Sequence, residues 1–202
     1  QKKQEPSPTK VWFPASHPNY EHAHSSNMLM ITLFVEENNT LTPNFYNDFI
    51  NNLQFHQLTC PCGHSGCLSV HGYYNRSIKL PDGKTVFRIC RVKCECCGHT
   101  HAILLSSMVP YSQVSTSDHI SIIHNYSNKV SQNSVMNNNP SIDESNYRYI
   151  IKCYRRYWME KLRSEQIPLT PFCRLVKSCF AYFSYQFMQI KNTPNILFVN
   201  TT

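Results

Sequence analysis

The stretch that decides the fold is CPCGHSGC at residues 60–67, together with CECCGHTH at residues 94–101. These two cysteine clusters flank a segment rich in β-forming residues, LSVHGYYNRSIKLPDGKTVFRICRVK at residues 68–93. Because Asp82-Gly83 suits a type I′ turn, the segment is predicted to be a long β-hairpin with one cluster at each end. This is the plan of a zinc ribbon, in which two tight turns each deliver two thiolates to one tetrahedral metal.

Metal binding explains the clusters better than disulfides or a catalytic thiol. Nothing in the sequence indicates an oxidising compartment, and neighbours such as Cys96-Cys97 pair poorly with each other. Reactive thiols of C-x-x-C motifs lie at helix N-termini, whereas Cys94 is predicted to follow a strand. Four protein ligands would leave no position for an activated water. We therefore expect a structural Zn²⁺ that stabilises a hairpin with little apolar area of its own.

The predicted ligands come in equal number from the two clusters. Cys94 and Cys97 have the C-x-x-C spacing and a following glycine that let backbone amides turn toward a thiolate. In the first cluster, Cys60 and Cys62 are one residue too close for that spacing, while Cys62 and Cys67 are wider apart. The sequence leaves open which two of these three bind the metal. Cys96 is predicted to be spare, and the substitute ligands nearby are His64, His99 and His101.

The rest of the chain predicts an α+β protein. Residues 1–27 are expected to form an extended arm, 28–57 a strand-helix unit, 58–108 the ribbon, and 109–202 a helical module of helix-turn-helix type. Helix starts are predicted at Thr42-Pro43 and Thr170-Pro171, and at two capping boxes, Ser115 to Asp118 and Ser141 to Glu144. The last helix is predicted to carry an apolar stripe that extends to Ile190.

The charge balance favours a polyanionic partner. Lys and Arg outnumber Asp and Glu by 19 to 12, which gives a net charge of +7. On the helix predicted at 143–163, the apolar side runs from Tyr147 to Leu162. Five basic residues project together onto an adjacent face: Arg148, Lys152, Arg155, Arg156 and Arg163. A solvated positive face is the alternative interpretation, but phosphate contacts would relieve the repulsion between its like charges.

A second basic surface is predicted on the hairpin, where the aromatic residues Tyr73 and Tyr74 are interleaved with six basic residues: Arg76, Lys79, Lys84, Arg88, Arg91 and Lys93. Aromatic rings interleaved with arginines can stack on unpaired bases. The hairpin therefore also suits RNA or single-stranded nucleic acid.

The residues at about 58–113 resemble the zinc-ribbon domain of an uncharacterised bacterial family similar to the N-terminal zinc fingers of insertion-sequence transposases. The resemblance covers the first cluster, H-G-x-Y-x-R, the hairpin, R-V-x-C-x-x-C-G-x-T-H and a proline-tyrosine exit. Its matching positions are His71, Gly72, Tyr74, Arg76, Arg91, Val92, Cys94, Cys97, Gly98, Thr100, His101, Pro110 and Tyr111. In those transposases a helix-turn-helix follows, so the resemblance implies DNA binding and an origin in mobile elements.

Transposase activity is not expected. The chain holds four Asp and eight Glu, and no strand-rich domain follows the helical segment to carry an acidic triad. The sequence thus predicts a cytoplasmic, zinc-dependent DNA-binding protein that is not an enzyme. It predicts no membrane partner, because no apolar run approaches about 20 residues. The possible partners are a second copy of the chain or a transposase. The alternative function is a protein interaction adaptor that docks a partner through the ribbon and the Phe-rich last helix.

Overall fold

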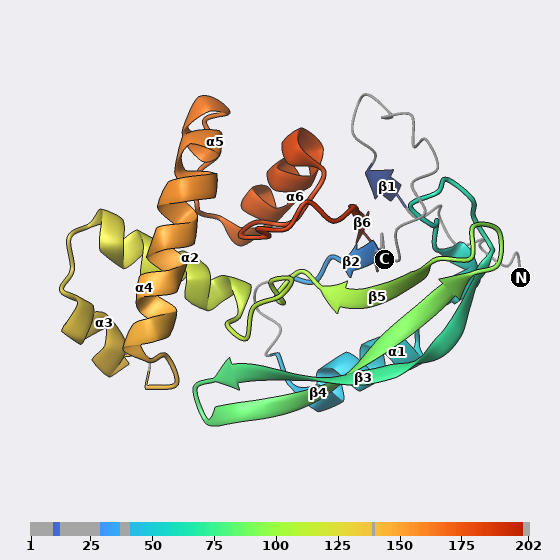
Figure 1. Cartoon of the computed structure of the whole chain (residues 1–202), viewed down its shortest axis with the longest axis horizontal. Helices are drawn as coiled ribbons and strands as arrows, with labels where there is room; N and C mark the ends of the chain where they lie inside the picture. The colour runs from blue at the N-terminus through green and yellow to red at the C-terminus, as the bar shows by residue number, and fades with distance from the viewer. Residues whose placement is uncertain (1–9, 13–28, 37–40, 139, 200–202) are drawn as a thin grey trace, which may run out of the picture.

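The structure is a computed structural model that describes residues 10–12, 29–36, 41–138 and 140–199. It is an α+β fold built on one six-stranded mixed sheet with the order β1-β6-β2-β5-β4-β3 (Figure 1). The strands are β1 (Lys10–Trp12), β2 (Leu29–Leu33), β3 (Leu68–Leu80), β4 (Gly83–Cys94), β5 (Thr100–Leu105) and β6 (Asn195–Val199). Of the expected arm only β1 is described, and the rest of residues 1–27 lies outside the described residues.

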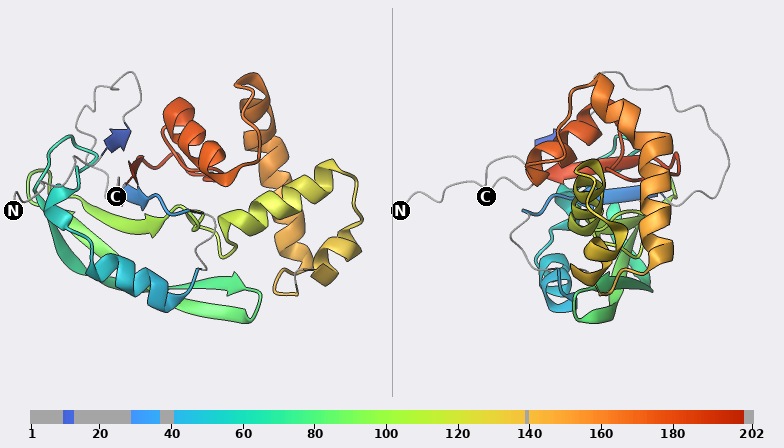
Figure 2. Two further views of the ribbon diagram at one scale, coloured as in Figure 1. Left: turned by 180° about the vertical axis from the view of Figure 1, so that it is seen from behind. Right: turned by 90° about the vertical axis from the view of Figure 1, so that its left-hand side faces the viewer.

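The predicted hairpin is present and is the longest feature of the sheet. Strands β3 and β4 pair antiparallel from Leu68 opposite Cys94 to Leu80 opposite Gly83, with one irregularity between Val70 and Gly72. A strand of this length spans about 40 Å. The hairpin places the cysteine clusters at one end of the molecule and its own turn at the other, beneath the helices (Figures 1 and 2).

Strands from both ends of the chain complete the sheet. Strand β2, from the predicted strand-helix unit, pairs in parallel with β5 on one side and with β6 on the other. Strand β6 lies in a segment for which the sequence predicted only helix. The hairpin is therefore not a free-standing ribbon, because its sheet continues through β5 into strands 35 residues or more away in sequence.

The helices are α1 (Pro43–Asn51), α2 (Thr116–Ser127), α3 (Gln132–Asn138), α4 (Glu144–Cys153), α5 (Met159–Ser164) and α6 (Phe172–Phe183). The short 3₁₀ turn η1 (Phe55–Gln57) precedes the first cysteine cluster, and the π turn η2 (Tyr154–Trp158) joins α4 to α5. Helices α2, α3 and α4 contact one another in pairs and gather beside the hairpin turn (Figure 2).

The helix caps show where local sequence signals were sufficient. Thr42 and Ser115 cap α1 and α2 as predicted, each accepting a backbone N–H three residues on. The capping box at Ser141 was wrong: Asp143 caps α4 instead, accepting from the Asn146 amide at 2.8 Å. The predicted Thr170 cap was also wrong, because α6 begins at Phe172 and its N-cap residue, Pro171, makes no side-chain cap bond.

The protein has two hydrophobic cores. The first core packs against α1 and includes Ile31, Phe87 and Ile103, and the second lies in the helical module and includes Trp158 and Leu175. Neighbouring residues of β6 face opposite cores, since Leu197 lies in the second and Phe198 in the first. The last helix ends at Phe183, and buried Phe187 extends the second core from beyond the helix.

Tyr46 of α1 closes a gap between β4 and β5. The ladder between these strands ends at Arg91 opposite Ala102, so Cys90 and Ile103 would form the next pair. The buried Tyr46 hydroxyl lies between them instead, accepting the Cys90 amide and donating to the Ile103 carbonyl, each at 2.9 Å. One side chain thereby satisfies two backbone groups that the strands leave unpaired.

Tyr46→Phe is expected to lower the free energy of unfolding by about 2–3 kcal/mol, because it leaves a buried N–H and a buried C=O without partners. Urea denaturation measures the change. Tyr182→Phe, which removes a hydroxyl from a side chain that is 59% exposed, is the matched control and should stay within about 0.5 kcal/mol of the wild type. Equal effects of the two substitutions would contradict the bridging role of Tyr46.

A buried histidine makes the stability depend on pH. His119 of α2 is 3% exposed, its Nδ1–H donates to the Ser115 carbonyl at 2.7 Å, and burial lowers its pKa from 6.5 to about 4. Between these two pH values the unfolded chain binds a proton that the folded chain does not. The free energy of unfolding is therefore unaffected by the protonation of His119 above pH 6.5. It falls by on the order of 3 kcal/mol as the pH is lowered from 6.5 toward 4. Urea titrations at several pH values should show this slope reduced in His119→Gln, and an unchanged slope would contradict it.

Candidate metal centre and basic surface

Each cysteine cluster folds into a tight knuckle with the same local design. In the first knuckle the Cys62 amide lies 3.5 Å from the Cys60 sulfur, and in the second the Cys97 amide lies 3.4 Å from the Cys94 sulfur. The residue after the second cysteine is a glycine with positive φ in both: +91° at Gly63 and +73° at Gly98. Other residues rarely adopt this backbone conformation, so the two glycines allow the chain to turn back around the sulfurs.

The two knuckles are held together by backbone as well as by side chains. The Glu95 amide donates to the Cys67 carbonyl at 2.8 Å, which ties the second knuckle directly to the first. Within the knuckles, the Cys60 amide donates to the His64 carbonyl at 2.8 Å and the Cys94 amide to the His99 carbonyl at 2.9 Å. The two knuckles are therefore joined by a backbone hydrogen bond between residues 28 positions apart in the sequence.

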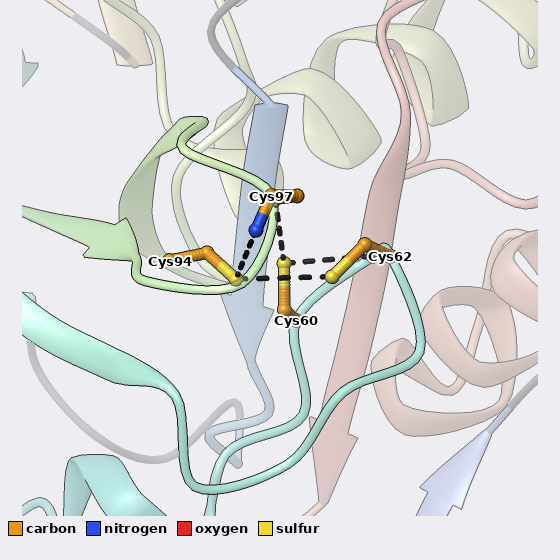
Figure 3. Close-up of side chains that lie close together, drawn as sticks. All are labelled: Cys60, Cys62, Cys94 and Cys97. Carbon is orange, nitrogen blue, oxygen red and sulfur yellow. Dashed lines mark hydrogen bonds between the residues drawn. The ribbon is translucent and has the colours of Figure 1, made fainter. Parts of the chain in front are cut away.

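Four sulfurs form a cysteine quartet: Cys60, Cys62, Cys94 and Cys97, all within 4.8 Å of one another (Figure 3). The Cys60 and Cys97 sulfurs are 3.7 Å apart, and those of Cys62 and Cys94 are 3.8 Å apart. In a tetrahedral site with Zn–S bonds of about 2.3 Å, neighbouring sulfurs are about 3.8 Å apart. The quartet could therefore hold a tetrahedral metal ion, and of the three cysteines of the first cluster it includes Cys60 and Cys62.

Cys67 lies beside the quartet rather than in it. Its sulfur is 3.2 Å from that of Cys94, and it forms a second close group with Cys94 and the exposed Cys96. All ten cysteines, every one of which lies in the described residues, are free thiols. The apolar neighbours of Cys153, Cys173 and Cys179 predict three buried thiols. Cys153 and Cys179 are buried, whereas Cys173 is exposed, so the prediction was wrong for Cys173.

The thiols of the quartet differ in acidity. Burial raises the pKa of Cys60 above its usual range and that of Cys97 to about 11. For Cys94, burial also opposes ionisation, but hydrogen bonds from the Cys97 amide and the Cys67 thiol outweigh it and lower its pKa to about 6. The lowered pKa favours the Cys94 thiolate at neutral pH, and metal binding would release protons from the neighbouring thiols.

His101 supports the quartet from behind. Its side chain is fully buried, and its Nε2 lies 3.2 Å from the Cys60 sulfur. Burial lowers the pKa of His101 to about 4, so the ring is neutral at pH 7. Its Nδ1 has no hydrogen-bond partner within the described residues, which favours the tautomer that donates Nε2–H to the sulfur. Such a bond stabilises a bound thiolate, so His101 orients a ligand rather than replacing one.

The basic residues predicted on the long helix are all exposed, on the continuous segment α4–η2–α5: Arg148, Lys152, Arg155, Arg156 and Arg163. Arg148 pairs with Glu144 at 2.5 Å, and the guanidinium of Arg156 lies 5.2 Å from the Tyr157 ring. Of the other three, none forms an ion pair with a described residue. The π turn that contains Arg155 and Arg156 was not predicted, and it adds an extra residue in the middle of this surface.

The hairpin arginines are positioned differently. Arg76 donates to the Ser112 carbonyl at 2.7 Å and also to the Val109 carbonyl, and burial lowers its pKa. Arg91 is half-buried, and its Nε has no hydrogen-bond partner among the described residues. Lys79, near the hairpin turn, pairs with Asp143 at 2.7 Å. These contacts fasten the hairpin to the loop at 109–112 and to the start of α4, so the structure does not bring Arg76 and the helix arginines onto one exposed surface.

No helix in the described part of the chain is long and apolar enough to cross a membrane. Comparison with curated proteins and with solved structures found no match. The region from the first knuckle cysteine to the middle of α4, residues 60–149, matches the family model of a domain of unknown function (DUF6431).

Proposed function

We propose that the protein binds DNA through the α4–η2–α5 surface and that a structural Zn²⁺ in the cysteine quartet fixes the scaffold carrying it. The observation that supports this most is the set of exposed cations at Lys152, Arg155, Arg156 and Arg163. Because neighbouring like charges cost free energy on an isolated helix, an anionic partner stabilises the arrangement. Phosphate groups of a duplex supply that charge at regular spacing.

The order of the helices supports a helix-turn-helix role for this segment. Helices α2, α3 and α4 contact one another in pairs, and residues 128–131 and 139–143 connect them. In three-helix DNA-binding domains the third helix enters the major groove. Here the third helix is α4, which buries Tyr147, Ile150 and Ile151 while its basic side faces solvent. A helix of this kind has the dimensions of the groove.

Zinc suits the quartet on chemical grounds. Four thiolates are the ligand set of structural Zn²⁺ sites, and they leave no coordination position for substrate or water. The quartet lies at the opposite end of the hairpin from α4 (Figure 1), so the ion would act by holding the sheet end rather than by touching DNA. No metal-activated chemistry is proposed for it.

The aromatic residues of α6 that an adaptor function would need pack inside the protein. Phe180 is 3% exposed, and the ring of Phe183 packs edge-on against Trp158 at 5.8 Å between centroids. The Lys161 ammonium also lies beside the rings of Trp158 and Phe183, and it is 4.7 Å from the centroid of the Tyr185 ring. The second core therefore covers the face of α6 that was expected to dock a partner, and DNA binding is the better supported proposal.

A salt series tests it. Fluorescence anisotropy with a labelled random duplex at 50–200 mM salt should give a linear fall of log K with log salt, with a slope of about −3.6 for four phosphate contacts. Single-stranded DNA and RNA of the same length should bind more weakly. Absence of duplex binding at the lowest salt, or an affinity that does not respond to salt, would contradict the proposal.

A further inference from the structure

The quartet leaves two cysteines of the knuckles unused, and they lie together. The sulfurs of Cys67, Cys94 and Cys96 are all within 4.8 Å of one another. Cys94 belongs to this group and to the quartet, so the two groups share one sulfur. Cys67 comes from the last position of the first knuckle and Cys96 from the middle of the second, so this group also bridges the two knuckles.

We propose that this second group binds a second divalent thiophilic ion of the zinc class, with Cys94 as a thiolate that bridges the two ions. This inference rests on the proposed metal in the quartet and adds a site that the quartet does not need. The second ion would have three protein ligands and one coordination position open to solvent, because Cys96 is exposed and Cys67 is half-buried.

The distances are compatible with a thiolate site of this size. With metal–sulfur bonds of about 2.3 Å, sulfurs around a tetrahedral or trigonal ion are about 3.8–4.0 Å apart, within the 4.8 Å limit that the three sulfurs meet. The Cys67 and Cys94 sulfurs are closer than that, at 3.2 Å, which is a thiol hydrogen bond. An ion would replace the shared proton, and rotation of the half-buried Cys67 side chain opens the contact.

The charge change also permits a second ion. One divalent ion with four thiolates has a net charge of −2. A second divalent ion brings two positive charges while the Cys67 and Cys96 thiols release two protons, so the cluster keeps the same net charge and two positive ions are screened by six thiolates. The open fourth position makes this ion the exchangeable one, since closed four-thiolate sites are the structural ones.

Native mass spectrometry of the reduced full-length chain, titrated with Zn²⁺, tests the second site. The wild type should bind two ions, the second at least tenfold more weakly and lost first to a mild chelator. Cys67→Ser and Cys96→Ser should each bind one ion. Cys173→Ser is the matched control, because Cys173 is also exposed but lies in α6, and it should bind two.

One ion in the wild type at saturating Zn²⁺, or two ions retained in either variant, would overturn the proposal. If Cys67→Ser fails to fold, Cys96→Ser decides, because its side chain is exposed. If the chain binds one ion and still binds duplex DNA, only the second site is contradicted. If the chain binds no ion, the metal site of the quartet is contradicted as well.

Discussion

Removing the metal from the cysteine quartet is expected to lower the free energy of unfolding by more than about 4 kcal/mol, the stabilisation given by an ion present at a thousand times its dissociation constant. Without the ion, the four sulfurs of the quartet would no longer be bonded to one centre that ties the two knuckles together. Chelation of the wild type and Cys94→Ser should give the same loss, measured by urea denaturation with and without Zn²⁺.

The loss should be concentrated in the knuckles. The core beside α1 contains buried residues of β2, β4 and β5, so it does not depend on the metal alone. Hydrogen exchange should therefore accelerate most at residues 59–67 and 94–100, while Ile103 and Phe87 stay protected. Cys173→Ser, an equal substitution at an exposed site outside the knuckles, should change neither the stability nor the exchange. Full stability of the chelated chain would contradict a structural metal.

The second large effect is expected on the basic surface. Arg155→Ala with Arg156→Ala should weaken duplex binding on the order of 100-fold at low salt and reduce the salt slope by about 2, because each arginine that leaves a phosphate removes about one unit of slope. The two side chains are exposed, so the fold should be unaffected. Anisotropy titrations at several salt concentrations measure both quantities.

A charge-matched control separates a specific surface from net charge. Arg174→Ala removes an exposed arginine from α6 and should leave the salt slope within about 0.3 of the wild-type slope. The single substitution Arg155→Ala, which removes the same charge, should reduce the slope by about 1. If the single substitutions at Arg155 and Arg174 weaken binding equally, the protein responds to total charge and the proposed surface is wrong.

Local signals in the sequence predicted the elements whose causes are local. The turn at Asp82-Gly83 gives the hairpin, and Thr42 and Ser115 cap α1 and α2, because turn and cap chemistry depends on residues a few positions apart. Asp143 rather than Ser141 caps α4. Both residues can accept the amide of a first turn, and the Lys79 ammonium, which comes from 64 residues earlier, pairs with Asp143.

The sheet could not be predicted because its pairings are distant in sequence. Strand β2 pairs with β5 and β6, so Ile31 lies opposite Ile103 and Ile196. A short apolar run such as that of β6 does not reveal by itself whether it is a strand or part of a helix. Once β2 and β5 are in place, β6 covers an edge that would otherwise leave backbone groups unpaired.

The sequence predicted the chemistry of the candidate site but not which of its cysteines come together. The spacing of the cysteines identified the knuckles, but it did not distinguish Cys60, Cys62 and Cys67 as ligands. Only the fold, which brings Cys60 and Cys62 together with Cys94 and Cys97, separates Cys67 from the quartet. In the same way, Arg76 has the sequence context of a surface residue. Its guanidinium is held by carbonyls of a loop more than 30 residues away, which no local pattern shows.

X-ray absorption at the zinc edge, on the chain loaded with one equivalent of Zn²⁺, tests the cysteine quartet most directly. The geometry predicts a single shell of four sulfurs at about 2.3 Å. A shell containing nitrogen or oxygen, or a chain that leaves its one equivalent of zinc in solution, would contradict it.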